Sequence, residues 1–153
     1  RQALSNPYTG VLAIFASRLL KGKPPLLHED GRQLRDFVSV YDVARACRLA
    51  LEVPAADGQV FNIGTGRACS VGEVAARLAE ALGKRSVSPE VTGRYRNGDI
   101  RHCFADIALA GEILGFRPEV TLEEGLVSLA ASITRGDDGR PPAGGPGPQR
   151  WLP

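Results

Sequence analysis

Residues 58–83 predict a strand, a glycine turn and a helix in immediate succession, and this order constrains the fold more than any other feature of the chain. GQVFNIG, residues 58–64, is a short apolar run that predicts a strand buried on both faces. Ser70 and Glu73 then have the spacing of a capping box, which opens a helix that Gly83 ends. A strand followed at once by a helix is the unit of α/β folds, so we expect an α/β architecture.

Four further helices are expected, because caps, apolar periodicity and glycine stops recur along the chain. Asn6 can cap a helix that has Pro7 at its first position, where the missing N–H costs nothing. Helices are also expected to begin at Ser39, Asp106 and Thr121. Ser39 and Thr121 each have an acidic residue three positions later, which again indicates capping boxes.

The remaining segments predict one amphipathic helix face, three short strands and a tail. The helix after Ser39 is expected to bury an apolar face made of Val43, Ala44, Cys47, Ala50 and Leu51. One short strand is expected on each side of the turn 29–31, although Asp30-Gly31 also suits a longer loop. Residues 86–93 predict a weak edge strand because Pro89 has no backbone donor. Residues 136–153 are dominated by glycine and proline and are expected to be disordered.

The charge balance and the cysteines exclude several classes of function. With 19 basic and 17 acidic residues, the chain has no general positive field, which argues against a nucleic-acid partner. Cys47, Cys69 and Cys103 are widely separated and form no Cys/His cluster, so we expect no disulfide framework, no metal site and a reducing, cytoplasmic environment. No apolar run approaches the ~20 residues of a membrane span. The chain begins without a methionine and is interpreted as a piece of a longer protein.

No complete catalytic set is found in the sequence. Gly64-x-Gly66 supplies the first two glycines of a dinucleotide fingerprint, but Cys69 stands at the third position, and the turn is equally explained as a plain connection from strand to helix. A tyrosine acting as general acid or base would need a lysine four residues later on the same helix face. None of the three tyrosines has one, so no catalytic residue is assigned.

Arginines offer ligand-binding chemistry instead. Arg35 stands in a predicted strand, and Arg94, Arg96 and Arg101 surround Asp99 in RYRNGDIR. A guanidinium binds phosphate oxygens through paired donors, in charge-assisted hydrogen bonds worth about 1.5–3 kcal/mol each, and a nearby carboxylate suits a ribose hydroxyl. The alternative for each arginine is an exposed ion pair of little energetic value, and spacing alone favours that alternative.

Four segments, taken in order from about Arg1 to Ile133, resemble the C-terminal part of extended short-chain dehydrogenase/reductases that act on nucleotide sugars. They are RQALSNPYTGVLAIFASRLLKGKPPLLHEDGRQLRDFVSVYDVARACRLALE, VFNIGTGRACSVGEVAARLAEALG, RNGDIRHCFADIALAGEILGFRP and TLEEGLVSLA. The resemblance is to the NAD-dependent epimerase/dehydratase family, of the UDP-glucose 4-epimerase type. It implies a truncated α/β unit in residues 1–135, with the last elements of a Rossmann-type fold near residues 36–66 and a small α/β substrate-binding domain.

The resemblance also implies roles for individual residues. Arg35, in RDFV, matches the family arginine that binds the nucleotide diphosphate. Arg96, in RNGD, matches a second diphosphate-binding arginine, and Asp99 matches the acid that contacts ribose. Leu27 and His28 lie in a segment that is similar to the one running along the base, largely through backbone contacts.

In this family, the glycine-rich NAD turn and the Tyr-x-x-x-Lys pair lie upstream of the segment that matches this chain. The resemblance therefore implies that NAD is bound by the missing N-terminal domain of a parent enzyme, that the substrate is a UDP- or dTDP-sugar, and that this chain alone is inactive. It also implies a homodimeric 4-epimerase as the parent. Two alternatives stay open: a 4,6-dehydratase or decarboxylase relative, and a non-catalytic nucleotide-sugar-binding module.

Overall fold

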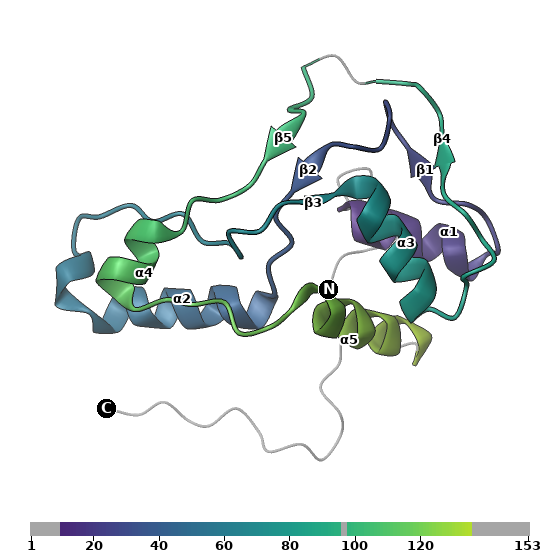
Figure 1. The fold of residues 1–153 in the computed structure, drawn as a ribbon. Coiled ribbons are helices and arrows are strands. Elements are labelled where there is room, and N and C mark those ends of the chain that lie inside the picture. The colour runs from purple at the N-terminus through teal and green to yellow at the C-terminus, as the bar shows by residue number, and fades with distance from the viewer. Residues whose placement is uncertain (1–9, 96–97, 136–153) are drawn as a thin grey trace.

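The computed structural model describes residues 10–95 and 98–135, which form helices interspersed with short strands (Figure 1). The helices are α1 (Val11–Leu20), α2 (Val40–Glu52), the 3-10 helix η1 (Pro54–Ala56), α3 (Val71–Ala81), α4 (Ala108–Leu114) and α5 (Leu122–Thr134). The strands are β1 (Leu26–Leu27), β2 (Leu34–Arg35), β3 (Cys69–Ser70), β4 (Glu90–Val91) and β5 (His102–Cys103). The predicted α/β class is confirmed. The predicted cap Asn6 and the predicted disordered tail lie outside the described residues.

Strand β2 is the centre of a sheet with the order β3-β2-β5. It pairs antiparallel with β3 and parallel with β5, so Arg35 lies opposite Cys69 on one side and Cys103 on the other. The sequence predicts no element at β5, because two strand residues leave no periodic pattern to detect. The predicted edge strand is present as β4, which pairs parallel with β1. The two strands that flank the turn 29–31 therefore belong to different sheets.

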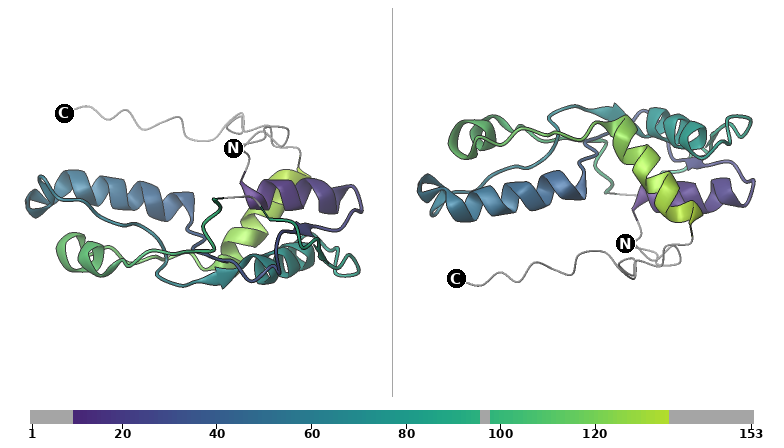
Figure 2. Two further views of the ribbon diagram at one scale, coloured as in Figure 1. Left: turned by 90° about the horizontal axis from the view of Figure 1, so that it is seen from above. Right: turned by 90° about the horizontal axis from the view of Figure 1, so that it is seen from below.

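Helices α1, α3 and α5 gather at one end of the molecule around a hydrophobic cluster, while α2 and α4 lie at the other end (Figure 2). The cluster brings together Phe15 and Leu19 from α1, Leu78 from α3 and Leu126 from α5, each at most 3% exposed. Leu27 of β1 packs into it and links the helices to the smaller sheet.

Reciprocal caps start two of these helices. At α3, Ser70 Oγ accepts the Glu73 N–H at 3.2 Å, and the Glu73 carboxylate accepts the Ser70 N–H at 2.9 Å. Thr121 and Glu124 repeat the arrangement at α5, so both predicted capping boxes are confirmed. The hydrogen bonds from Ser70 and Thr121 hold the pKa values of Glu73 and Glu124 below the usual range of a glutamate.

Two other predicted caps differ in detail. Ser39 caps α2 by accepting the Tyr41 N–H at 3.3 Å, but no reciprocal capping box forms there. Asp106 accepts the Ala108 N–H at 2.9 Å, although the N-cap position of α4 is Ile107, one residue later than predicted. Ser39 and Asp106 therefore both accept a backbone N–H at the start of a helix, but the predicted capping box at Ser39 and the predicted start of α4 are wrong.

The second cluster is built by α2, η1 and α4 around Ala46, Ala56, Ala110, Leu114 and Phe116. The predicted buried face of α2 is only partly correct: Ala44 and Cys47 are exposed and Leu51 is 89% exposed. Ala46, which was not in the predicted face, is the buried contact. Helix α2 turns the face that carries Ala46 toward α4 and η1, because these are its packing partners within the described residues.

The predicted buried strand at residues 58–64 is wrong. No strand forms there in the described structure, and Val60 is 86% exposed. A strand needs a hydrogen-bonded neighbour, and the sheets of the described residues place none beside this segment. An apolar pattern predicts what a segment can bury and does not supply the partner that buries it.

Asp42 is the acidic residue of the expected capping box at α2, and it has a different task. Its side chain is 2% exposed and accepts the N–H groups of Glu119 at 3.0 Å and Val120 at 3.1 Å. Arg45 adds a hydrogen bond at 3.0 Å. Burial alone would raise the pKa of Asp42, but these hydrogen bonds outweigh burial and lower it. Asp42 therefore fastens the segment between α4 and α5 to α2.

Replacing Asp42 by asparagine is expected to lower the free energy of unfolding by about 1–3 kcal/mol, because an amide cannot accept from all three donors. The pKa of Asp42 is lower in the folded state than in the unfolded state, so its stabilisation is complete above the unfolded pKa of about 4 and is lost as the pH falls through the folded pKa. Wild type should therefore lose more stability than Asp42→Asn between about pH 5 and pH 2. Urea unfolding measured at several pH values tests this, and parallel pH profiles would contradict it.

Candidate functional site

The residues predicted to bind a ligand meet where β2, the turn after β1 and the segment before β5 come together. Arg35 Nη2 and Asp99 Oδ1 are 3.8 Å apart, although 64 positions separate these residues in sequence (99 − 35 = 64). Leu27 ends β1 and His28 follows it at the start of the turn. Arg96 lies outside the described residues, so its predicted role stays a prediction. Four of the five predicted residues thus lie in these converging segments, and Arg35 and Asp99 are directly paired.

The guanidinium of Arg35 is fixed by backbone carbonyls. Nη1 donates to Leu34 O at 2.8 Å and to Arg101 O at 2.9 Å, and Nη2 donates to Ile100 O at 2.6 Å. These bonds use three of the five N–H groups of the guanidinium. The N–H on Nε and one N–H on Nη2 have no hydrogen-bond partner among the described residues. The side chain is therefore held in one orientation with donor capacity left for an anion.

Arg101, beside the segment that Arg35 binds, forms ion pairs with two residues of the turn after β1. It donates to Glu29, and its Nη2 donates to Asp30 Oδ2 at 2.7 Å. The hydrogen bond from Arg101 lowers the pKa of Asp30. The side chains involved are partly exposed, so the ion-pair interpretation that the sequence favoured for an isolated arginine describes Arg101 well. The pair ties the segment that carries Asp99 to the turn 29–31.

Leu27 and His28 contribute mainly through their backbones. The Leu27 side chain is 6% exposed and packs in the first hydrophobic cluster, while its carbonyl accepts both the N–H and the hydroxyl of Thr92, at 2.9 and 3.0 Å. The His28 side chain is exposed, and its carbonyl accepts Gln33 Nε2 at 2.9 Å. These contacts shape the turn beside Arg35, with the imidazole of His28 facing solvent.

Asp36 is a central residue of this region that the sequence did not single out. Its carboxylate accepts the Thr65 N–H at 2.9 Å, the Gly66 N–H at 3.0 Å and the Ala105 N–H at 3.4 Å, as well as the Thr65 hydroxyl. It therefore joins β2 to the turn 64–66 and to the chain just after β5. An acidic residue next to Arg35 in a predicted strand was the available signal, but its partners lie 29 to 69 positions away.

The Gly64-x-Gly66 turn is shaped by this carboxylate. A Cβ on Gly64 would collide with Asp36 Oδ2 and would stand 2.7 Å from Ala105 Cβ. Gly66 has φ 69°, in the left-handed region that favours glycine. The N–H groups of Thr65 and Gly66, which would face a phosphate in a dinucleotide fingerprint, are occupied by Asp36. The geometry favours the plain-turn interpretation of this motif.

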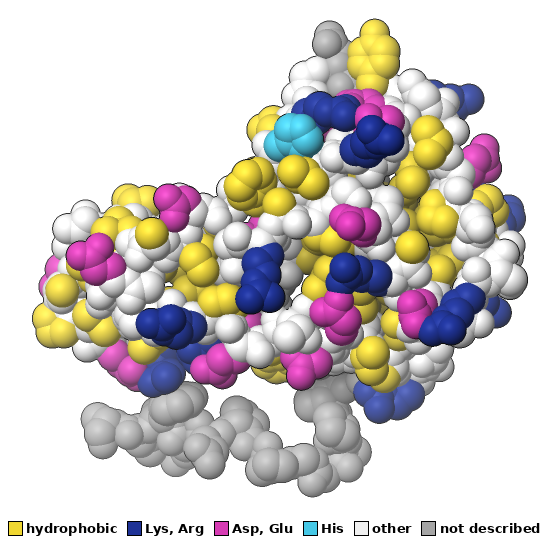
Figure 3. All heavy atoms as spheres, in the orientation of Figure 1, with side chains coloured by type: hydrophobic (Ala, Val, Ile, Leu, Met, Phe, Trp, Pro, Cys, Tyr) yellow, Lys and Arg dark blue, Asp and Glu magenta, His cyan; other side chains and the backbone are white. Residues whose placement is uncertain are grey.

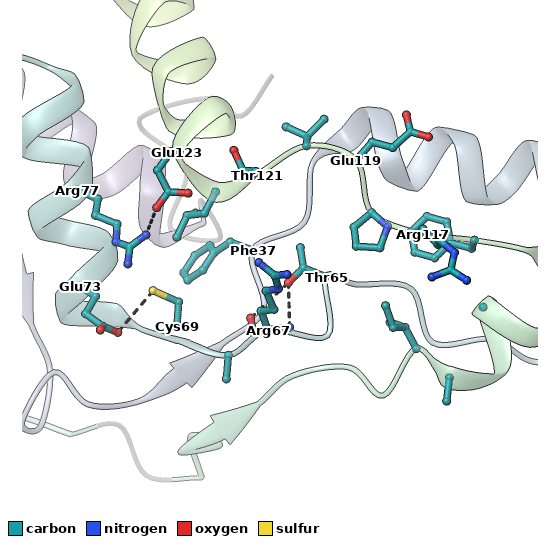
Figure 4. A pocket seen from close by; sticks show the side chains of 18 residues that line it. Phe37, Thr65, Arg67, Cys69, Glu73, Arg77, Arg117, Glu119, Thr121 and Glu123 are labelled. Atoms are coloured by element: carbon teal, nitrogen blue, oxygen red, sulfur yellow. Dashed lines mark hydrogen bonds and ion pairs between the residues drawn. The ribbon is translucent and has the colours of Figure 1, made fainter.

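A cavity of about 860 Å³ lies beside the same turn, between α3, α4 and the start of α5 (Figure 4). Its carboxylates are all engaged: Glu73 in the α3 capping box, Glu119 with Arg45 at 3.0 Å, and Glu123 with Arg77. Of the predicted site residues that the structure describes, none lines the cavity.

Two guanidinium groups of this cavity, those of Arg67 and Arg117, have no carboxylate partner among the described residues. Cys69 also faces it, and burial, together with the nearby Glu73 carboxylate, raises the pKa of its thiol. A thiol with a raised pKa is less readily ionised to the nucleophilic thiolate.

The face drawn in Figure 3 carries basic and acidic side chains interspersed with one another. Across residues 10–95 and 98–135, no helix combines the length and apolar character needed to cross a membrane. The same residues contain no cluster of three or more metal-ligating side chains, and their three cysteines are free thiols.

A sequence model described as the NAD dependent epimerase/dehydratase family matches residues 3–64. The chain is 38% identical over 135 residues to dTDP-L-rhamnose 4-epimerase of Burkholderia thailandensis, an alignment that covers 88% of this chain and 36% of the relative.

Solved structures give the same result. UDP-glucose 4-epimerase of Thermotoga maritima, solved with UDP-glucose, superposes with a TM-score of 0.81 and 38% identity, covering 90% of this chain and 43% of that one. MoeE5, solved with UDP-glucuronic acid and NAD, superposes with a TM-score of 0.73 and 37% identity, covering 86% and 43% respectively. This chain therefore spans well under half the length of the proteins it matches.

Proposed function

Because the chain belongs to the NAD-dependent epimerase/dehydratase family, we propose that it forms the nucleotide-sugar-binding part of a 4-epimerase of the UDP-glucose 4-epimerase type. The observation that supports this most directly is the fixed orientation of Arg35, which stands beside Asp99 with two N–H groups left over. The relatives solved with UDP-glucose and UDP-glucuronic acid support a nucleotide sugar as the ligand.

In this proposal, Arg35 binds the diphosphate of a UDP- or dTDP-sugar and Asp99 accepts a hydrogen bond from the ribose. Arg96 is the second diphosphate arginine, and the backbone around Leu27 and His28 lies along the base. None of these residues takes part in bond making. Binding energy from the nucleotide, far from the reacting carbon of the sugar, orients that carbon.

NAD, when bound to the parent enzyme, would accept and return the hydride of the sugar. The described residues do not fit a dinucleotide, because Asp36 occupies the amides of the only Gly-x-Gly turn that precedes a helix in the described segments. The sequence also has no Tyr-x-x-x-Lys pair. We therefore assign NAD binding and the chemical step to the rest of a longer enzyme, which we place in the cytoplasm as a homodimer, and we propose that this chain alone is inactive.

The exposed apolar side chains of α2 and the following segment support the proposal that this chain packs against the rest of a longer enzyme. Val40, Tyr41, Leu51 and Val60 are each more than 70% exposed, although apolar residues of this size are usually buried. Residues 36–66 are proposed to complete a Rossmann-type sheet whose other strands lie elsewhere in the enzyme. That sheet would supply the neighbour that residues 58–64 lack in the described structure.

Replacing Arg35 by alanine in the full-length protein should weaken UDP-glucose binding by about 10- to 100-fold, because a charged donor to phosphate contributes about 1.5–3 kcal/mol. The affinity for NAD should be unchanged. Isothermal titration with UDP-glucose, dTDP-glucose and NAD measures these values separately.

The matched control is Arg48→Ala, which removes an exposed arginine of α2 that pairs with Glu52 at 2.6 Å, away from the site. Equal affinities for the sugar nucleotide in wild type and Arg35→Ala would refute the proposed diphosphate role. The product of turnover separates the remaining candidates: a 4-epimer supports the epimerase, whereas a 4-keto-6-deoxy sugar would indicate the dehydratase.

A further inference from the structure

Arg35 and Asp36 are neighbours in the chain, and each holds one end of the same segment. Arg35 binds the carbonyls of Ile100 and Arg101, just before β5, at 2.6 and 2.9 Å. Asp36 binds the N–H of Ala105, just after β5, at 3.4 Å. Strand β5 is therefore held on β2 from both sides by two consecutive side chains.

The strands themselves are too short to fix this arrangement. The pairing of β2 with β5 covers two residues on each strand, so the ladder supplies few hydrogen bonds and a weak definition of register. Side-chain bonds to the backbone must supply the rest. Arg35 makes two such bonds before β5 and Asp36 makes one after it, while the same carboxylate also takes the N–H groups of Thr65 and Gly66.

The chemistry of the position calls for a carboxylate. Three backbone N–H groups and one hydroxyl converge on Asp36, and an ionised carboxylate offers acceptor sites only. An asparagine of the same size would turn an NH₂ group toward donors. The turn has no space for adjustment, since Gly64 packs directly against the carboxylate.

We infer that Asp36 is a positioning residue for the nucleotide-sugar site: it fixes β5 and the turn 64–66 against β2, and thereby sets the orientation of Arg35 toward the diphosphate. This inference rests on the proposed function. Asp36 itself touches no ligand. Its effect on binding passes through Arg35 and through the carbonyls that hold the guanidinium.

Asp36→Asn and Asp42→Asn in the full-length protein form a matched pair for the test. Both aspartates accept backbone N–H groups from distant segments, but Asp42 fastens the segment before α5 and not the site. Both variants should lower the midpoint of urea unfolding. Asp36→Asn should also weaken UDP-glucose binding by about tenfold, which corresponds to about 1.4 kcal/mol, whereas Asp42→Asn should change it less than about twofold.

A double-mutant cycle separates positioning from a general loss of structure. If Asp36 acts through Arg35, Asp36→Asn should weaken binding only slightly further in the Arg35→Ala background. Thr65→Val keeps the volume of the side chain and removes one donor to Asp36, so it should weaken binding in the same direction, and it provides the test if Asp36→Asn does not fold.

The outcomes distinguish this inference from the proposed function. Equal affinities in Asp36→Asn and Asp42→Asn, or additive effects of Asp36→Asn and Arg35→Ala, would overturn the inference and leave the proposed function in place. A wild-type protein that binds neither UDP-glucose nor dTDP-glucose would overturn the proposed function and the inference together.

Discussion

Replacing Phe116 by alanine is expected to lower the free energy of unfolding by about 3–5 kcal/mol, the largest effect of any substitution considered for this chain. Phe116 is 1% exposed, and three of the four other buried residues of its cluster are alanines. Such short side chains cannot move into the space that the ring leaves. The ring also lies 5.4 Å from the guanidinium carbon of Arg45, a cation–π contact worth about 0.5–1 kcal/mol.

Urea unfolding followed by circular dichroism measures the loss. Phe104→Ala is the control, because it removes the same side chain from a position that is 54% exposed. Its effect should be much smaller, since less apolar area is uncovered. Similar losses in the two variants would show that the second cluster is not packed as the structure describes it.

Replacing Leu78 by alanine should cost about 2–5 kcal/mol at the other end of the molecule. Leu78 has no exposed surface and lies on α3, between α1 and α5, in the cluster that also holds Leu19 and Leu126. Removing three carbon atoms from this position leaves a cavity that three separate helices would have to close. The midpoint of urea unfolding should fall accordingly, with little change in the slope of the transition.

Leu20→Ala provides the comparison within the same region, because Leu20 follows the buried Leu19 on α1 and is itself 41% exposed. Its loss of stability should be well below that of Leu78→Ala. A larger loss for Leu20 than for Leu78 would mean that α1 turns a different face to the cluster.

The elements that could be predicted from sequence are those whose hydrogen bonds close within a few residues. The capping boxes at Ser70 and Thr121 are of this kind, because cap and partner are three positions apart. Ser39 has the same local signal, but Asp42 prefers backbone donors 77 and 78 positions away, and no local pattern reveals that choice.

The same distinction between local and long-range contacts explains which residues of the candidate site could be predicted. Arg35 and Asp99 were selected through a family resemblance and not through spacing, and the structure places them 3.8 Å apart. Asp36 could not be selected, because its donors come from two distant segments and an acidic residue beside an arginine is common. The strand expected at residues 58–64 is wrong because an apolar run gives no information about pairing: no strand lies beside this segment in the described residues, and Val60 is exposed.

Consecutive side chains of an extended chain point to opposite faces, and Arg35, which ends β2, is followed at once by the opposite charge of Asp36. Arg35 binds the carbonyl of Arg101 before β5, and Asp36 binds the N–H of Thr65 in the turn 64–66. A shift of the pairing between β2 and β5 by one residue would exchange these faces, since a one-residue slip reverses the direction of every side chain in a strand. The Asp36 carboxylate would then stand where the Arg35 guanidinium now lies, so the register of a two-residue pairing decides the sign of the charge on this side of the strand.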